Sequence, residues 1–340
     1  MDISLFDYQL PTDRIAQKPM EPREAAKLLV LDRETGGIDD KRVGDLPDLL
    51  KKGDLLIFND SKVFKARLKA EIFGRNTRYA GTEVEIFLLR PDEDRWIALA
   101  RPGKKLQTNG RVLFENGMKA RILGKRDDGT VDLDFGVHPD RVFELADEFG
   151  EVPVPPYVEP TEENTSAYQT VYAKHVGSVA APTAGFHFTP ALLDQLEKKG
   201  IERAFVTLHV GLGTFRPIKT DTLEAHEMHE EWAHVPKATS EAIAKAKREG
   251  RRVIVVGTTA MRAVESRAGR EFSGFTKLFI TPGYDFKVAD GMITNFHLPK
   301  STLIVLVSAF AGRENVMNAY KHAVENDYRF YSFGDAMLIV

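Results

Sequence analysis

Three histidines, His187, His209 and His297, each lie in a short stretch that also holds hydroxyl residues and lies next to an apolar run. A neutral imidazole with an ordinary pKa near ~6.5 can accept or donate a proton under physiological conditions. Histidines in loops at strand and helix ends line clefts more often than cores. We therefore predict that these three take part in proton transfer within one cleft. A structural, hydrogen-bonded role for each of them remains the alternative.

The stretch around His187 has a well-marked helix directly after it. Thr189 is a suitable N-cap, Pro190 suits the first helical position, and Gly200 can end the helix. Residues 183–188 are therefore expected to form a loop at the positive end of a helix, where polar ligands bind readily. A plain connection between a strand and a helix is the alternative.

Two common kinds of site are not supported by the motifs. No G-x-G-x-x-G fingerprint follows a strand, so a nucleotide would have to be held by other loops. His226 and His229 have Glu231 nearby, but they lack the His-Glu-x-x-His pattern of zinc hydrolases. We predict no metal site, with metal ligation as the alternative. Structural hydrogen bonding is the expected role of this pair, and proton transfer or sugar-hydroxyl contact is its functional alternative.

The composition limits the class of protein. A chain of 340 residues is expected to form two domains. The absence of cysteine excludes disulfides, thiolate catalysis, iron–sulfur clusters and Cys-ligated zinc. The N-terminus lacks a signal pattern, and no apolar run approaches the roughly 18 residues of a membrane helix. We expect a cytoplasmic protein that does not bind membranes.

Charge is unevenly distributed along the chain. Residues 61–126 hold 16 Lys and Arg but only 7 Asp and Glu, an excess of +9 within a chain whose net charge is −3. A basic module of this kind is typical of polyanion contact, and solvated charges on exposed strands are the alternative. Arg101, Lys104 and Lys105 form its densest part and are the predicted RNA-binding residues.

The middle of the chain reads as β structure. Strands are expected over 84–89, 96–100, 111–114, 118–123 and 131–135, with hairpin turns at Asn116-Gly117 and Asp128-Gly129. A short helix near 141–148 and a proline-rich exit at 153–160 follow. The pattern predicts a small antiparallel barrel or sandwich.

The second half alternates helices with apolar strands. Helix 240–249, strand 252–256 and helix 260–267 indicate α/β packing with strands covered on both faces, and residues 55–58 have the same buried character. We predict a larger mixed α/β domain made of 1–60 and 153–340. An antiparallel β-barrel-like domain, 61–152, is inserted into it.

The chain also resembles a known family nearly from end to end, the S-adenosylmethionine:tRNA ribosyltransferase-isomerases of queuosine biosynthesis. Besides the three histidine stretches, the matching segments are Phe6-Asp7-Tyr8-Gln9-Leu10-Pro11, Ile15-Ala16-Gln17, Gly53-Asp54-Leu55-Leu56-Ile57-Phe58-Asn59-Asp60-Ser61, Pro153-Val154-Pro155-Pro156-Tyr157, Tyr168-Gln169-Thr170-Val171-Tyr172-Ala173, His226-Glu227-Met228-His229-Glu230-Glu231, Val256-Gly257-Thr258-Thr259, Pro282-Gly283-Tyr284 and Tyr328-Arg329-Phe330. Departures are modest, such as Lys27 where the family usually has Arg and Phe186 where it usually has Leu.

The resemblance implies a specific reaction. The ribosyl part of S-adenosylmethionine moves onto 7-aminomethyl-7-deazaguanine at the tRNA wobble position, giving epoxyqueuosine and releasing adenine and methionine. S-Adenosylmethionine is then a co-substrate, and no permanently bound cofactor is expected. The partner is a tRNA that carries this base in its anticodon, and the resemblance favours a monomer. A noncatalytic RNA-binding protein and a metal-dependent hydrolase are the alternatives.

This reaction needs a base beside the sulfonium, acid assistance to adenine release, and groups that orient the ribose. For the first two tasks the candidates are the three histidines. Hydroxyl and amide side chains would orient the ribose, arginines would bind the methionine end, and aromatic rings would stack on a base. The predicted substrate-binding residues are Thr183, Thr207, Thr214, Arg216, Thr258, Thr259, Arg262, Asn295, Phe6 and Tyr8.

Overall fold

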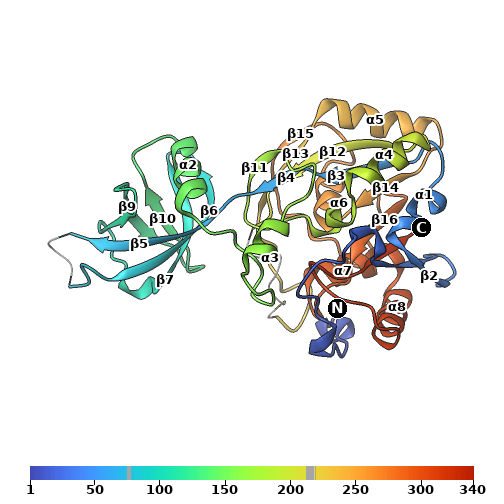
Figure 1. Ribbon diagram of the computed structural model, residues 1–340, viewed down its shortest axis with the longest axis horizontal. Coiled ribbons are helices and arrows are strands. Elements are labelled where there is room, and N and C mark those ends of the chain that lie inside the picture. Colours follow the sequence, from blue (N-terminus) through green and yellow to red (C-terminus); the bar gives the residue numbers. More distant parts are fainter. Residues whose placement is uncertain (75–77, 212–217, 219) are drawn as a thin grey trace. The chain divides into compact units, whose positions relative to one another are not determined.

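The computed structural model describes residues 1–74, 78–211, 218 and 220–340 (Figure 1). Contacts divide the chain into two compact units. The larger comprises 1–62, 155–175 and 181–340, and the smaller comprises 63–154 and 176–180. The predicted class, mixed α/β with an antiparallel β-barrel, is confirmed.

The larger unit is built on a sheet that has nine strands in the described residues, in the order β15-β13-β12-β3-β14-β16-β17-β1-β2. Their bounds are β1 Lys27–Leu31, β2 Ile38–Arg42, β3 Leu55–Asn59, β12 Glu202–Leu208, β13 Glu231–Val235, β14 Val253–Val256, β15 Phe272–Thr276, β16 Gly291–Asn295 and β17 Ala336–Ile339. The central strands β12, β3, β14 and β16 run parallel to their neighbours in that series, so their carboxyl ends share one edge.

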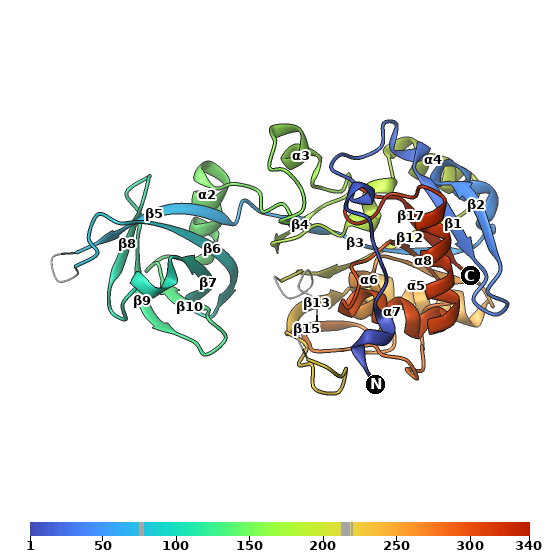
Figure 2. The same ribbon diagram turned by 90° about the horizontal axis from the view of Figure 1, so that it is seen from below.

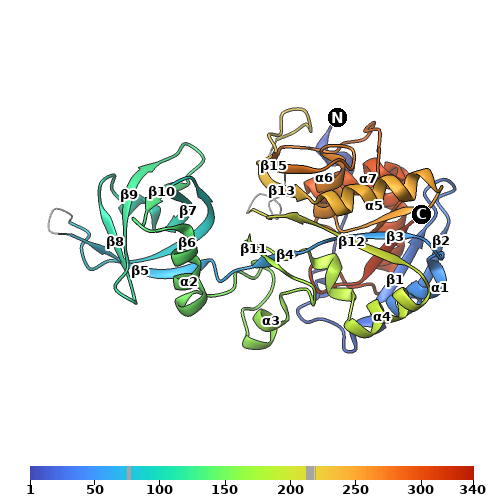
Figure 3. The ribbon, with the colours of Figure 1, turned by 90° about the horizontal axis from the view of Figure 1, so that it is seen from above.

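Helices cover both faces of this sheet, with α4 and α5 on opposite sides (Figures 2 and 3). Every residue of β3, β14 and β16 is buried, as expected for strands covered twice. The helices of this unit are α1 Leu46–Leu49, α3 Glu162–Ala167, α4 Pro190–Lys198, α5 Lys237–Arg248, α6 Thr258–Glu265, α7 Thr302–Ala311 and α8 Arg313–Glu325, with short 3₁₀ turns η1 Ile3–Phe6, η2 Thr12–Arg14, η3 Arg23–Ala25, η4 Val43–Asp45 and η6 Thr183–His187.

Capping fixes α4 where the sequence predicts it. The Thr189 side chain accepts a hydrogen bond from the Leu192 amide, and Gly200 takes a positive φ of 78° after the last turn. The preceding segment was predicted as a loop, but most of it, η6, is a 3₁₀ helix. Its buried apolar residues, such as Phe186, are held in this tight turn against the sheet.

The smaller unit is a closed antiparallel barrel in the order β10-β7-β6-β5-β8-β9. Its elements are β5 Arg67–Phe73, β6 Glu83–Asp92, β7 Arg95–Arg101, η5 Gly103–Lys105, β8 Arg111–Phe114, β9 Lys119–Lys125, β10 Val131–Asp134 and α2 Pro139–Phe149. A further pair, β4 Ser61–Val63 and β11 His175–Ser178, forms a two-stranded sheet where the division between units falls.

The predicted hairpins join β8 to β9 and β9 to β10. The predicted two-residue turns are wrong in detail, because only Gly117 and Gly129 take a positive φ. Asn116 and Asp128 instead accept hydrogen bonds from the amides two residues later. Each hairpin is therefore a three-residue loop that ends in glycine.

Candidate functional site

A hollow lies in the larger unit at the carboxyl ends of parallel strands β14 and β16. It encloses about 610 Å³ of space free of protein atoms, part of it open to solvent. This strand-end hollow is lined by Tyr157, Ala181, Pro182, Thr183, Ala184, Val210, Gly257, Thr258, Thr259, Thr294, Asn295, Phe296, His297, Leu298, Ser301, Leu303, Tyr331 and Ser332. Ligands of open α/β sheets bind at this edge.

The amino end of α6 forms one wall of the strand-end hollow. Gly257 leaves β14 with a φ of 89°, a conformation that favours glycine, and so turns the chain into the helix. Thr258 and Thr259 occupy the first helical positions, where backbone amides lack acceptors within the helix. The Asn59 amide donates to the Thr259 hydroxyl at 3.0 Å, which fixes that side chain. Polar groups of a ligand can bind here.

His297 also lines the hollow, two residues after the end of β16. Its Nε2 lies 2.8 Å from the Thr294 hydroxyl, and its backbone amide donates to the Tyr320 hydroxyl at 3.0 Å. The Tyr8 hydroxyl donates to the His297 carbonyl at 2.5 Å. Tyr8 therefore holds the backbone of His297 through this hydrogen bond, but it does not itself line the hollow.

Asn295 joins the segment of His187 to this wall. The Nδ2 atom of Asn295 lies 3.2 Å from Nε2 of His187, and the Thr183 hydroxyl donates to Oδ1 of Asn295 at 3.4 Å. Thr183 and Asn295 line the hollow, whereas His187 lies behind Asn295. Two of the three predicted histidine segments thus meet at one place.

Both histidines are neutral at physiological pH. Burial lowers the pKa of His297 to about 3. Burial, with the nearby cations Arg23 and Arg329, lowers the pKa of His187 to about 3 as well. A neutral imidazole can accept or donate a hydrogen bond without carrying a charge that would repel a cationic ligand.

The His209 side chain does not line the strand-end hollow, although Val210 does. Its ring stacks on Trp232 with 5.1 Å between ring centroids, and burial lowers its pKa to about 4. The pKa of His209 is lowered further by neighbouring His175, whose Nε2 lies 3.6 Å from the Asp60 carboxylate. His209 thus belongs to a second polar cluster.

Thr207, another predicted ligand residue, belongs to this cluster. Its hydroxyl donates to Oδ1 of Asp60 at 2.7 Å. Burial raises the pKa of the Asp60 carboxyl. Sequence reasoning missed Asp60 and His175 as candidate functional residues. The position of Asp60, directly after buried strand β3, was the available signal, whereas nothing marked His175.

The remaining predicted ligand residues have other surroundings. The Arg262 guanidinium is buried in an ion pair with Glu231, and Glu231 also accepts from the Gly211 amide at 2.8 Å. This pair holds the chain where β12 ends, away from the lining of the hollow. Phe6 is fully buried and does not line it either. Thr214 and Arg216 lie outside the described residues.

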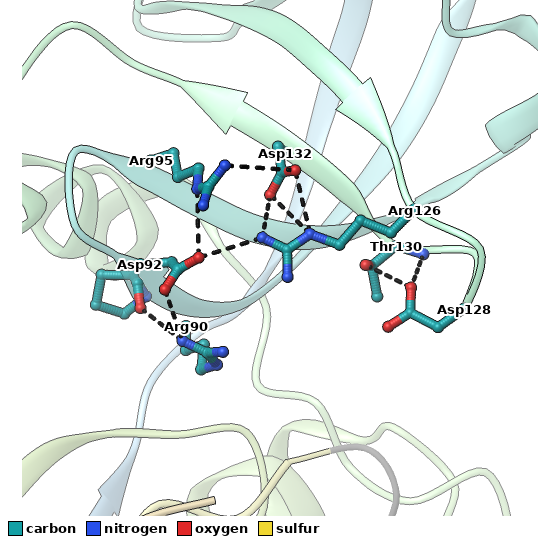
Figure 4. Close-up of polar contacts among 8 residues, drawn as sticks. Arg90, Asp92, Arg95, Arg126, Asp128, Thr130 and Asp132 are labelled. Carbon is teal, nitrogen blue, oxygen red and sulfur yellow. Dashed lines mark hydrogen bonds and ion pairs between the residues drawn. The ribbon is translucent and has the colours of Figure 1, made fainter. Parts of the chain in front are cut away.

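In the smaller unit, Arg101 and Lys104 are exposed, and Lys105 is half-buried in η5. Over 63–154 the sequence holds 16 Lys and Arg and 16 Asp and Glu, so acids after residue 126 balance the basic excess. Figure 4 shows part of this balance. Arg126 donates to Asp132 at 2.6 Å and to Asp92 at 3.2 Å. We call Arg101, Lys104 and Lys105 the basic site at η5. The unit that carries them has equal numbers of basic and acidic residues.

Two kinds of feature are missing from the described part of the chain. None of its helices is long and apolar enough to cross a membrane. Across the same residues, no group of three or more His, Asp or Glu side chains is arranged to hold a metal ion.

Comparisons with known proteins agree over almost the whole chain. A family model described as queuosine biosynthesis protein matches residues 3–339. The chain is also similar to a crystal structure at 2.00 Å resolution of the S-adenosylmethionine tRNA ribosyltransferase from Thermotoga maritima. The two share 38% sequence identity with a TM-score of 0.57, over 99% of this chain and 100% of the other.

Proposed function

The chain belongs to the queuosine biosynthesis protein family, and on that premise we infer that it transfers and isomerises the ribosyl group of S-adenosylmethionine on tRNA. The carrying observation is the 38% identity to a ribosyltransferase of this name across 99% of the chain. The acceptor we propose is 7-aminomethyl-7-deazaguanine at the wobble position, with epoxyqueuosine, adenine and methionine as products.

The strand-end hollow is the proposed nucleoside site. Its walls combine apolar side chains with a few convergent polar groups, as is typical of small-molecule sites. Thr258, Thr259, Thr183 and Asn295 supply hydroxyl and amide groups for the ribose and adenine. His297 is neutral there, so it does not repel the cationic sulfonium of S-adenosylmethionine.

For the proton transfers, His297, His187 and His209 stay the proposed residues, with different positions relative to the ligand. His297 lines the hollow and can contact the ribose directly. His187 would act through Asn295. His209, beside Asp60 and His175, would serve a part of the substrate outside the hollow.

We propose that the tRNA phosphates contact the basic site at η5, through Arg101, Lys104 and Lys105. Arg101 and Lys104 are exposed and Lys105 is half-buried, which supports this assignment. We also propose that the inserted domain carries this contact, and that the protein works as a monomer in the cytoplasm. Neither alternative function gains support from the comparisons, since both the family and the similar structure carry names from tRNA modification.

Release of adenine tests the proposed function. The protein is incubated with S-adenosylmethionine and a tRNA that carries 7-aminomethyl-7-deazaguanine, and adenine and the modified nucleoside are quantified by chromatography. We expect the two products in equal amounts, and neither of them with a tRNA that carries guanine at that position. Release of no adenine by folded protein with the modified tRNA would exclude the activity.

A variant pair tests the site. Because a proton-transfer group contributes roughly 10²- to 10⁴-fold to turnover, His297→Gln should reduce adenine release by such a factor. Gln195→Ala, at an exposed position of α4 in the same unit, is the control and should keep the parent rate. Equal rates for both variants would remove His297 from the chemistry.

A further inference from the structure

A second cavity lies in the larger unit next to the strand-end hollow. It comprises about 220 Å³ of space free of protein atoms, part of it open to solvent, and is lined by Arg23, His187, Arg329 and Ser332, among others. We call it the arginine cavity. Its two guanidinium groups come from η3 and from the segment before β17, so the fold brings together cations more than 300 positions apart.

Arg329 carries hydrogen-bond donors that the protein leaves unused. Its Nη1 donates to the Lys18 carbonyl at 3.3 Å, and its Nη2 lies 3.5 Å from a carboxylate oxygen of Asp335. Among the described residues, the buried Nε and Nη2 atoms have no hydrogen-bond acceptor. A guanidinium offers five donors in a planar fork, and buried unsatisfied donors are unfavourable. An incoming anion would satisfy them.

Arg23 faces the same cavity. It donates to the carbonyls of Phe186 and Ala167 at 3.2 and 3.3 Å, and neither acceptor is charged. The Arg23 and Arg329 cations both lower the pKa of His187, after burial, which places their charges close to the cavity wall.

The acidic groups nearby are largely engaged elsewhere. Asp335 accepts from the backbone amides of Lys27 and Arg329 at 2.9 and 2.7 Å. Glu24 accepts from the hydroxyl of Thr189, and Glu21 is exposed. Two guanidinium groups line the arginine cavity, and the buried carboxylate of Asp335 is paired with one of them, so the cavity keeps a positive character.

The arginine cavity and the strand-end hollow are adjacent. Ser332 lines both of them. The contact between His187 and Asn295, 3.2 Å long, separates them, with His187 lining one and Asn295 lining the other. A nucleoside in the strand-end hollow would thus have the two guanidinium groups on the other side of this shared wall.

We propose that the arginine cavity binds the α-carboxylate of the methionine part of S-adenosylmethionine while the nucleoside occupies the strand-end hollow. This assignment rests on the proposed function. Arginine is suited to the role because its planar fork matches a carboxylate with two parallel hydrogen bonds. A small cavity with buried donors favours the end of a small molecule over the phosphate of an RNA backbone.

Binding of three ligands to the unaltered protein gives the first test. Calorimetry compares S-adenosylmethionine, its carboxyl methyl ester, and a dimethylsulfonium adenosine that lacks the amino-acid part. Since a charge-assisted hydrogen bond contributes about 10- to 100-fold in affinity, the ester should bind weaker than S-adenosylmethionine by such a factor. Equal affinity of ester and parent ligand would overturn the proposal.

Variants then assign the effect to the cavity. Arg329→Met keeps much of the side-chain length without the charge, Arg23→Met does the same on the other wall, and Arg248→Met on exposed α5 is the control. We expect either cavity variant to weaken S-adenosylmethionine by about 10- to 100-fold, to leave the dimethylsulfonium ligand unchanged, and to abolish the difference between ester and acid. Thermal melts by circular dichroism confirm that each variant is folded.

Three results would contradict the proposal. An equal loss for all three ligands would indicate a structural role for the arginines. A loss of tRNA affinity with unchanged S-adenosylmethionine affinity would assign the cavity to RNA phosphate. Failure of the unaltered protein to bind S-adenosylmethionine at all would overturn the proposed function itself. The comparison of variants tests only the role of the arginine cavity.

Discussion

Burial of a neutral His297 should make the larger unit sensitive to acid. In the folded protein the pKa of His297 is about 3, which is lower than in the unfolded chain. Between these two pKa values the unfolded chain therefore binds more protons than the folded protein. Stability therefore rises with pH in this range and is lost as the pH falls below the unfolded pKa of ~6.5. From pH 7.5 to pH 5.0, His297 alone should lower the free energy of unfolding by about 2 kcal/mol.

His297→Gln removes the titrating group while its amide can still pair with the Thr294 hydroxyl. The variant loses some packing at every pH, so the informative quantity is the change in its stability between the two pH values. We expect this change to be smaller than that of the parent by about 2 kcal/mol. Gln195→Ala, at an exposed position of α4, removes no titrating group, so its stability should change with pH as that of the parent does.

Urea unfolding followed by tryptophan fluorescence measures this quantity in the relevant unit. The chain has two tryptophans, Trp96 in the smaller unit and Trp232 in the larger one. In a Trp96→Phe background, the signal reports the larger unit alone. If His297→Gln loses as much stability between pH 7.5 and pH 5.0 as its parent background, His297 is not held neutral by burial and the reasoning fails.

In the same Trp96→Phe background, protonation of His209 should quench the fluorescence of Trp232, on which it stacks, with a midpoint near the lowered pKa of about 4. Arg262→Met should lower the free energy of unfolding by about 3–5 kcal/mol in urea titrations, because it removes the cation that is paired with the buried carboxylate of Glu231. Replacing Lys104 and Lys105 by Ala should weaken tRNA binding and reduce the slope of log affinity against log salt by about 1 to 2.

Matched variants separate these effects from general damage. His209→Gln should abolish the acid quench, and a quench that persists would come from another group. Adding Glu231→Leu to Arg262→Met should recover much of the lost stability, since the buried carboxylate is then removed as well. Lys237→Ala with Lys245→Ala, on exposed α5, should leave the salt slope unchanged. An equal slope in both double-lysine variants would place the RNA contact elsewhere.

The local elements of this protein follow from its sequence. The β-barrel strands, the two glycine-terminated hairpins and helix α4 with its Thr189 cap rest on alternation, turn residues and capping, which act within a few residues. The buried runs of β3 and β14 likewise predict strands covered on both faces. The location of a polar site next to the ends of such strands follows from the same local signals.

Only tertiary packing decided which polar residues meet. The contact of His187 with Asn295 joins positions 108 residues apart, and no local pattern encodes it. Similar loop composition gave the three histidines equal weight, yet the His209 ring stacks on Trp232 and does not line the hollow. Arg262 was predicted to bind the substrate, but its buried guanidinium forms an ion pair with Glu231. Long-range burial therefore determined the pKa and the partner of each side chain, because both depend on neighbours distant in the sequence.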